Sequence, residues 1–349
     1  MPLYIQSATQ ISAQQPLTDE WFESPLHYDE NKALSIDPKF ADYLSPIMSR
    51  RMCSLLKRAI VTSRLTLQKA CVEIPDAIIS GTGLGCIENT EKFLYAIREN
   101  EEKFLQPTYF MQSTHNIISS AIAIDLKCHG YNTTYVHRGI SFENALLDTI
   151  IQFRQQKIRS ALVGGFDELT PDYHIFFDRI GIWNFSKRDM SNPKTACFAG
   201  EAAVSMLLHC EKNEQTLCEL NDVEIMYRPT IEQMRQTLDA LLSRAGCSLA
   251  DVDAVVVGTN SNPENDAVYE NVIPQLFSNL SVVQYKHLFG QSFTAPALGT
   301  YAASLCLHKQ QIPAHLLTGR EANISPVKRM LLYNHYRNKS HSFILLSRC

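Results

Sequence analysis

The residues around position 139 have the types and spacing expected of a site for nucleophilic catalysis. Residues 135–151 predict a β-branched strand, a sharp corner at Gly139 and then a helix. Such a corner commonly holds a nucleophile at the positive end of a helix dipole. His137, Ser141 and Glu143 lie within four positions of it. We interpret Ser141 as a helix cap, Glu143 as a residue favoured by the dipole, and His137 as a structural residue of the strand.

A glycine-rich segment, GTGLG at residues 81–85, suggests phosphate binding. Glycine loops before helices can cradle phosphates with their backbone N–H groups. The segment lacks the third glycine of the dinucleotide-binding signature and the Gly-Lys-Ser/Thr ending of the P-loop. We therefore interpret it as a tight turn from a strand into a helix.

The composition is that of a globular protein without general affinity for nucleic acid or membrane. The 349 residues are 45% hydrophobic, and 36 acidic against 32 basic residues give a net charge of -4. No stretch approaches the roughly 20 apolar residues of a membrane span, and the first residues lack signal-peptide features, so we expect a cytoplasmic protein. The ten cysteines show no C-x-x-C spacing. We predict reduced thiols, no metal and no cofactor.

The alternation of aliphatic runs with amphipathic stretches predicts an α/β protein whose sheet is covered on both faces. Two echoes suggest that the chain is duplicated. The strand and turn at Gly81 recur at Gly258, an offset of 177 residues (258 − 81). A small-residue helix predicted from Gln112 recurs from Gln291, an offset of 179 (291 − 112). We expect both of these helices, at 112–126 and 291–305, to lie deep between layers.

The order of these segments resembles that of β-ketoacyl synthases, in the thiolase superfamily, along nearly the whole chain. Residues 163–167 (VGGFD) resemble the family's segment ending in Gly-Gly-Ala-Glu, and residues 198–203 (FAGEAA) resemble its Gly-Glu-Gly-Ala strand entry. Residues 252–266 resemble Val-Asp…His-Gly-Thr-x-Thr-Pro-x-x-Asp, and residues 285–291 resemble Thr-Lys-x-x-x-Gly-His. The resemblance implies a thiolase-like fold: two similar halves, 1–205 and 206–349, stacked as five αβαβα layers.

In this register the family's three catalytic positions carry no reactive side chain. The place of the nucleophilic cysteine is Gly139, that of the first histidine is Gly258, and that of the second is Gln291. Condensation needs a thiolate to carry the acyl chain and donors that stabilise an enolate. The resemblance therefore implies a chain that has lost this chemistry.

The residual polar residues near the expected site are Lys286, Ser141 and His137. Lys286 matches the family's lysine. Two roles are open for it: organising polar contacts at the site, or forming an ion pair with Asp266 or Asp167.

The family's C-terminal Phe-Gly-Phe-Gly-Gly loop is also missing. Residues 333–340 (YNHYRNKS) stand in its place. Because bulky, charged residues do not share the access of glycine to positive φ angles, we expect a pocket entrance that is built differently.

Basic residues gather on one predicted helix: Arg50, Arg51, Lys57, Arg58 and Arg64. Acyl carrier proteins are acidic and could dock on such a helix. A solvated charged face is the simpler interpretation, and we favour it.

The leading hypothesis is a catalytically degenerate β-ketoacyl synthase homologue that acts as a chain length factor. It would pair with an active ketosynthase in type II biosynthesis of a polyketide or specialised fatty acid, such as an aryl polyene or resorcinol-like product, and meet an acyl carrier protein. One alternative is an active 3-oxoacyl-ACP synthase or acyltransferase with relocated residues, such as a Ser/His pair or Cys197. The other is a homodimeric acyl-binding protein.

Overall fold

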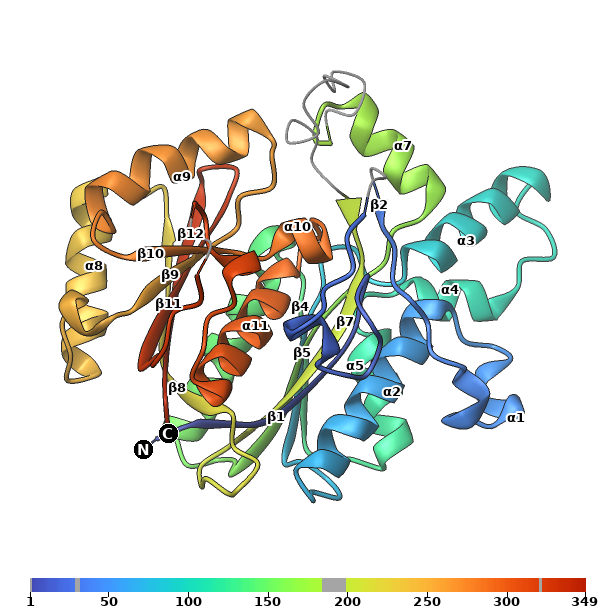
Figure 1. Ribbon diagram of the computed structural model, residues 1–349. Coiled ribbons are helices and arrows are strands. Elements are labelled where there is room, and N and C mark those ends of the chain that lie inside the picture. Colours follow the sequence, from blue (N-terminus) through green and yellow to red (C-terminus); the bar gives the residue numbers. More distant parts are fainter. Residues whose placement is uncertain (1, 29–31, 184–198, 320–321) are drawn as a thin grey trace.

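The computed structural model describes residues 2–28, 32–183, 199–319 and 322–349, and Figure 1 shows them as alternating layers of helices and strands. The strands are β1 (Tyr4–Ile11), β2 (Lys32–Ala33), β3 (Ala77–Gly81), β4 (Tyr131–Tyr135), β5 (Ser160–Asp167), β6 (Ala199–Gly200), β7 (Ala202–His209), β8 (Cys218–Tyr227), β9 (Ala254–Val257), β10 (Ser281–Gln284), β11 (Arg329–Tyr336) and β12 (Ser340–Ser347). The helices are α1 (Pro46–Ser49), α2 (Ser54–Lys69), α3 (Ile87–Glu99), α4 (Pro107–Ser113), α5 (Ile117–Leu126), α6 (Ser141–Arg154), α7 (Pro171–Arg179), α8 (Ile231–Arg244), α9 (Pro263–Leu276), α10 (Lys286–Phe289) and α11 (Ala295–Lys309). Within these described ranges, no helix is both long and apolar enough to cross a membrane.

The two halves of the large sheet have the same topology. Its order is β10-β9-β11-β12-β8-β1-β7-β5-β3-β4. In the first half β4, β3 and β5 are parallel, and β7 and β1 follow antiparallel. In the second half β10, β9 and β11 are parallel, and β12 and β8 follow antiparallel. The echo of Gly81 at Gly258 is confirmed, because these glycines end β3 and follow β9, which occupy matching places.

The halves join where β1 pairs with β8, through Tyr4 with Glu219 and Ile5 with Cys218. The expected boundary after residue 205 lies inside β7, which pairs along its length with β5 and β1. A division of the chain that leaves β7 whole falls at residues 210–217, before β8 begins.

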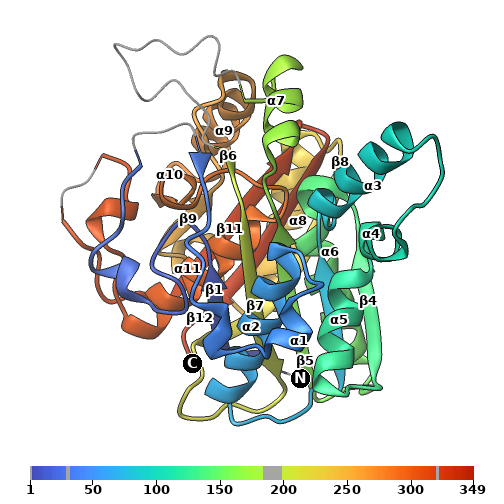
Figure 2. The same cartoon turned by 90° about the vertical axis from the view of Figure 1, so that its right-hand side faces the viewer.

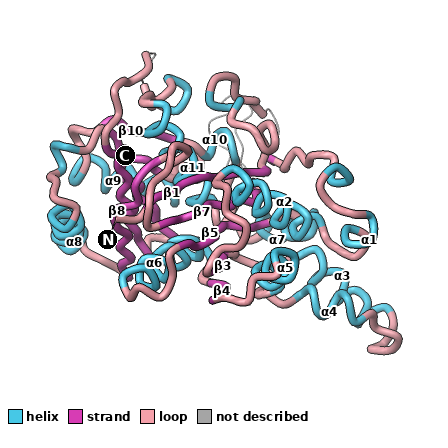
Figure 3. Tube along the Cα trace, turned by 90° about the horizontal axis from the view of Figure 1, so that it is seen from below, coloured by secondary structure: helices cyan, strands magenta, loops and turns pink. Residues whose placement is uncertain are grey.

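Side-chain alternation along the strands separates three hydrophobic cores, which define five layers. Ile78 of β3 packs with α2 and α5, whereas Ile79 packs with the central helices α6 and α11. Val255 of β9 packs with α8 and α9, whereas Val256 faces the centre. Successive strand residues point to opposite faces, so both halves of the large sheet are covered on both sides, as predicted. Figure 3 shows α8 on one side of the strands and α2 and α5 on the other.

The echo at an offset of 179 is not a structural repeat. α11 lies between the two halves of the large sheet and is buried throughout residues 295–307, as predicted. The segment from Gln112 instead divides at Thr114, which is extended, and continues as α5 on the outer face. Ile124 of α5 is 77% exposed, so the expectation of a deep helix at 112–126 is wrong. The topological counterpart of α11 is α6. Small and apolar residues alone do not distinguish a helix buried on one face from one buried all round.

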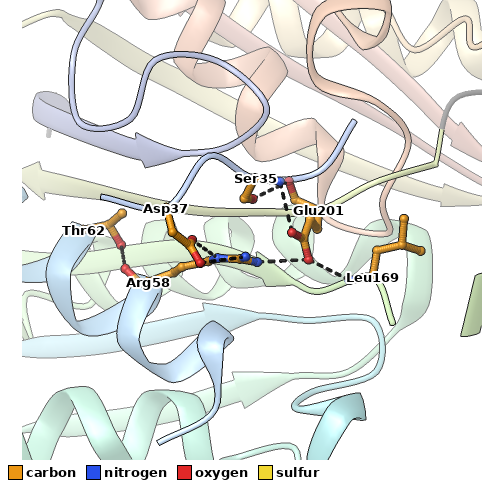
Figure 4. Close-up of polar contacts among 6 residues, drawn as sticks. All are labelled: Ser35, Asp37, Arg58, Thr62, Leu169 and Glu201. Atoms are coloured by element: carbon orange, nitrogen blue, oxygen red, sulfur yellow. Dashed lines mark hydrogen bonds and ion pairs between the residues drawn. The ribbon is translucent and has the colours of Figure 1, made fainter. Parts of the chain in front are cut away.

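Arg58 lies at the centre of a buried polar network rather than on a charged face (Figure 4). Its Nε lies 2.6 Å from Asp37 Oδ1, and its Nη1 lies 2.9 Å from Glu201 Oε2. Glu201 also accepts hydrogen bonds from the backbone N–H groups of Ser35 and Leu169. The Gly-Glu segment before β7 thus ties α2 to two loops.

The other basic residues do not share one surface either. Arg64 holds Asp125 of α5 through two hydrogen bonds, and Arg50 and Arg51 lie before α2 begins. The interpretation of these residues as one solvated or docking face is therefore wrong. Two of them serve the packing of α2.

Replacing Arg58 with alanine is expected to lower the free energy of unfolding by about 3–5 kcal/mol, because it leaves Glu201 buried without its cation. Urea denaturation measures this change. The exposed Arg51→Ala variant is the control and should lie within about 0.5 kcal/mol of the wild type. Equal stability of the two variants would show that the network contributes nothing.

Candidate functional site

The corner that begins α6 is closed by an aromatic ring. The turn Arg138–Ile140 leads from β4 into α6, with Arg138 at a φ of 51°. A Cβ added to Gly139 would lie 2.5 Å from Cδ2 and 2.8 Å from Cγ of Tyr336. A side chain at position 139 therefore collides with Tyr336 unless the ring moves. The place where the resemblance expects a nucleophile is filled by a neighbour.

Ser141 and His137 brace this turn. Ser141 Oγ accepts a hydrogen bond from the His137 N–H (2.7 Å) and donates one to the Arg138 carbonyl (2.8 Å). Ser141 is buried, but the expectation that it caps α6 is wrong, because both contacts of its hydroxyl stay within the preceding turn. His137 lies after β4, not within it, and its Nδ1 is 3.3 Å from Asn144 Nδ2 at an exposed place. The hydroxyl is thus engaged with the backbone.

Lys286 fills the space beside Gly258. A Cβ added to Gly258 would lie 2.7 Å from Lys286 Nζ and 2.6 Å from Tyr269 Oη. Lys286 is buried, and its Nζ donates a hydrogen bond to the Gly258 carbonyl (2.9 Å). The carboxylates of Asp167 and Asp266 accept hydrogen bonds from backbone N–H groups. Lys286 thus contacts the residue that occupies the expected place of the first histidine.

The glycine-rich turn is occupied by protein groups. Asp167 Oδ1 accepts a hydrogen bond from the Gly83 N–H (2.8 Å), and Thr82 Oγ1 accepts one from the Gly85 N–H (2.9 Å). These N–H groups are already engaged and cannot also cradle a phosphate. The predicted tight turn between β3 and α3 is confirmed.

The C-terminal hairpin sets the position of Tyr336. β11 and β12 are joined through Arg337 and Asn338, whose φ angles are 52° and 50°. The expectation that such residues avoid positive φ is wrong here. The connection comprises residues 337–339, and its turn is closed by the Lys339 N–H, which donates to the Tyr336 carbonyl (3.0 Å). A hairpin turn with positive φ at both central residues matches the twist of the strands, and this preference outweighs the cost at Arg337. The hairpin places Tyr336, the last residue of β11, over Gly139.

Glu143 is a buried acid whose role the sequence did not reveal. Its Oε1 accepts hydrogen bonds from Asn334 Nδ2 (2.7 Å) and Ser342 Oγ (3.0 Å), while the buried Oε2 has no hydrogen-bond partner within the described residues. Asn334 Nδ2 also donates to the Gly139 carbonyl (3.1 Å). Burial raises the pKa of Glu143 to about 7, although its hydrogen bonds and Lys286 act in the opposite direction.

One sequence signal could have located Glu143. Leu146 and Ile150 follow it at i+3 and i+7, the spacing of one helix face. Both are core residues. Glu143 therefore lies on the buried face of α6. A favourable interaction between an exposed carboxylate and the helix dipole does not explain its position.

His335 is a second titratable residue that the sequence analysis did not single out. Its Nε2 lies 3.0 Å from the Asn265 carbonyl, and its Nδ1 accepts a hydrogen bond from the Asn338 N–H (3.3 Å). Burial lowers the pKa of His335 to about 3, so the ring is neutral at physiological pH. Both ring nitrogens are engaged with the backbone.

The expected positions converge on one pocket. A cavity of about 850 Å³ is lined by Gly139, Lys286 and Gln291. Gly258 lies next to the cavity, because its carbonyl accepts a hydrogen bond from the lining residue Lys286. The lining includes five aromatic side chains: Tyr173, Phe177, Trp183, Phe293 and Tyr336. It also includes five side-chain amides: Asn260, Asn262, Asn265, Gln291 and Asn334. Asn260 Nδ2 donates to Gln291 Oε1 (3.1 Å). Such a lining can hold an apolar chain and hydrogen-bond a carbonyl.

The two repeated half-sheets and the pocket at their centre define a thiolase-like fold of the ketosynthase type. A family model described as the N-terminal domain of β-ketoacyl synthase matches residues 20–250, which is more than half of the chain. The chain belongs to the β-ketoacyl synthase family. No curated protein sequence matches it.

Three solved structures illustrate the likeness of fold. The ishigamide ketosynthase/chain length factor has a TM-score of 0.83 and 15% identity, with 100% of this chain and 99% of that chain covered. The ketosynthase ApeO in complex with its chain length factor ApeC, from Xenorhabdus doucetiae, has a TM-score of 0.79 and 14% identity, with 100% and 98% covered. The type II AntDE:AntF structure, an acyl-carrier protein in complex with its ketosynthase bound to the hexaketide, has a TM-score of 0.79 and 14% identity, with 100% and 99% covered.

Gly139→Ala is expected to destabilise the protein by about 1–3 kcal/mol, because the added methyl group overlaps the ring of Tyr336. The same change in a Tyr336→Ala background should cost at least about 1 kcal/mol less. A double-mutant cycle in urea measures the coupling. If Gly139→Ala lowers the free energy of unfolding equally in both backgrounds, the ring of Tyr336 does not contact position 139.

The raised pKa of Glu143 predicts a pH dependence of stability. Between about pH 4.5 and 7 the unfolded chain loses the proton of this carboxyl while the folded chain keeps it, so stability falls as pH rises, by up to ~1.4 kcal/mol per pH unit. Above about pH 7 both states are ionised and the decline ends. Wild type minus Glu143→Gln, measured by urea denaturation across this range, isolates the contribution. A difference that is flat or rises with pH contradicts the assignment.

Proposed function

We propose that this chain is a non-catalytic, chain-length-factor-like partner of an active ketosynthase. The observation that carries the proposal is the filling of the expected nucleophile position, where Tyr336 occupies the space that a side chain at Gly139 would need. Lys286 fills the corresponding space at Gly258. An acyl-enzyme needs a thiolate or another activated nucleophile, and enolate stabilisation needs aimed donors. The positions that supply these groups in the family carry neither here, while the fold persists.

A free sheet edge supports pairing with a second chain. β4 is the last strand of the sheet and pairs only with β3 among the described strands. Figure 2 shows β4 at the rim of the sheet beside α5. Exposed apolar side chains lie along this edge: Ile124 (77%), Tyr131 (38%) and Val136 (44%). An edge strand with apolar neighbours is a template for pairing with another chain. We propose that a ketosynthase covers it.

The pathway is proposed to be a type II system that makes a polyketide or a specialised acyl chain, such as an aryl polyene or resorcinol-type product. Similar structures include the ishigamide ketosynthase/chain length factor and a type II ketosynthase with its acyl-carrier protein. An acyl carrier protein is therefore the expected transient partner. We place this role in the cytoplasm, in keeping with the free thiols of the cysteines that the structure describes.

The pocket favours one alternative, a homodimer that binds an acyl group without any ketosynthase. Its volume of about 850 Å³ and its aromatic lining residues suit an acyl chain. Relocated catalysis by a Ser/His pair has less support, because the Ser141 hydroxyl is engaged with the backbone and His137 Nδ1 lies beside Asn144 Nδ2 (3.3 Å). Cys197 lies outside the described residues.

Co-expression with a ketosynthase from the same gene cluster, one that keeps its cysteine and two histidines, should give a 1:1 complex by light scattering. After incubation with acyl carrier protein thioesters, intact-mass measurement should find the acyl adduct on the partner and not on this chain. An adduct on this chain would support relocated catalysis. A stable homodimer that binds acyl groups and never co-purifies with the ketosynthase would support the acyl-binding alternative.

The edge can be tested with a matched pair of variants. Ile124→Glu combined with Tyr131→Lys should weaken the complex at least about tenfold, since it puts charges into an apolar interface. Tyr227→Lys, at a 68% exposed residue that ends β8 in the other half, should leave the complex unchanged. If the two variants weaken the complex equally, β4 is not part of the interface with the ketosynthase.

A further inference from the structure

A cluster of thiols and carboxylates lies outside the pocket, where three elements begin or end. The ligand atoms of Cys53, Glu88 and Glu168 all lie within 4.8 Å of one another. The thiol of the nearby Cys86, which lies outside this set of three, interacts with the Cys53 sulfur and supplies a fourth group. Cys53 precedes α2, Cys86 and Glu88 begin α3, and Glu168 follows β5. No catalytic or structural role assigned above uses these side chains.

The cluster is buried and rich in potential negative charge. Cys53, Cys86 and Glu168 are buried, and Glu88 is partly exposed with its Oε1 on Lys92. Buried carboxylates and thiolates cost free energy unless they are protonated or bind a cation. Lys92 forms its ion pair with Glu88, the partly exposed carboxylate of the cluster.

We propose that Cys53, Cys86, Glu88 and Glu168 bind one Zn²⁺ ion. Zinc takes four sulfur, nitrogen or oxygen ligands in a tetrahedron, with bonds of about 2.0–2.3 Å, which places ligand atoms roughly 3.4–3.8 Å apart. The ligand atoms of Cys53, Glu88 and Glu168 lie within 4.8 Å of one another without an ion, so zinc would draw them, and the Cys86 sulfur, closer together. Calcium and magnesium prefer six or more oxygen ligands, and softer metals prefer sets made only of sulfur. The mixed set fits zinc.

Binding replaces the protons of the Cys53 and Cys86 thiols, and that of any protonated carboxyl ligand, with the metal and releases them to solvent. Two thiolates and two carboxylates carry the same formal charge as the four thiolates of a Cys₄ zinc site. Glu168 Oε1 accepts a hydrogen bond from the Glu88 N–H (2.9 Å), so Oε2 is the oxygen offered to the metal. The partly exposed Glu88 gives the ion a path from solvent.

The metal would fix the scaffold beneath the pocket. Glu168 directly follows Asp167, whose carboxylate holds the Gly83 and Thr294 N–H groups. A zinc ion joining Glu168 to the starts of α2 and α3 would fasten the end of β5. Its role is structural, and it does not depend on the proposed partnership.

The full-length protein, kept reduced and free of chelators, should retain one zinc per chain by elemental analysis after gel filtration. Replacement by Co²⁺ should give a thiolate-to-cobalt charge-transfer band in the near ultraviolet. Cys53→Ser and Cys86→Ser should each lower zinc affinity about 100-fold or more in competition with a chromophoric chelator, since even residues that only support ligands cost 10–100-fold. Cys128→Ser is the matched control: it is also buried, its Sγ contacts the Pro75 carbonyl, and it should bind zinc like the wild type.

Glu168→Gln keeps the size of the side chain and provides a test if the cysteine variants fail to fold. It should lower zinc affinity while the cobalt charge-transfer band persists. The proposal is overturned by substoichiometric zinc, by a cobalt complex without a thiolate band, or by equal affinities of Cys53→Ser and Cys128→Ser. A Cys53–Cys86 disulfide in protein that binds no zinc when reduced would also overturn it.

Discussion

The ring of Tyr336 lies where a side chain at position 139 would begin, 2.5 Å from the Cβ that a larger residue would carry. The ring is held there by β11 and by a hairpin turn with two positive φ angles at Arg337 and Asn338. The corner between β4 and α6 can therefore keep its shape only with glycine, or with the ring displaced. The hairpin, the corner and the wall of the pocket form one packing unit.

Side chains also hold the carbonyl groups of the two glycine positions. Asn334 donates to the carbonyl of Gly139 (3.1 Å), and Lys286 donates to that of Gly258 (2.9 Å). Glu143 lies behind Asn334 and takes a second hydrogen bond from the same amide. Buried polar groups in such networks stabilise one arrangement of the backbone when their partners are satisfied. The centre of the fold is thus organised by amide, lysine and carboxyl groups that bind one another and the backbone.

Close packing of the central layer explains Gly165, one of two adjacent glycines in β5. A Cβ on Gly165 would lie 2.7 Å from Cβ of Ala297, so the absence of a side chain lets α11 approach the strand. Asp167 then binds the Thr294 N–H (2.6 Å) at the start of the same helix. The motif that resembles Gly-Gly-Ala-Glu therefore serves the packing of α11 whether or not chemistry occurs nearby.

Much of the fold followed from local patterns, because continuous aliphatic runs such as Ile78–Ile79 and Val255–Val256 indicate strands that are buried on both faces. The residue types at positions 139, 258 and 291, where the resemblance leads one to expect a cysteine and two histidines, can likewise be read from the sequence. Contacts between distant segments could not be predicted from neighbouring residues in this way. The placement of Tyr336 over Gly139, the burial of Arg58 against Glu201, and the meeting of Cys53 with Glu168 join residues far apart in the chain. Tertiary packing decided them, since a side chain's partners depend on how whole elements stack rather than on the residues next to it.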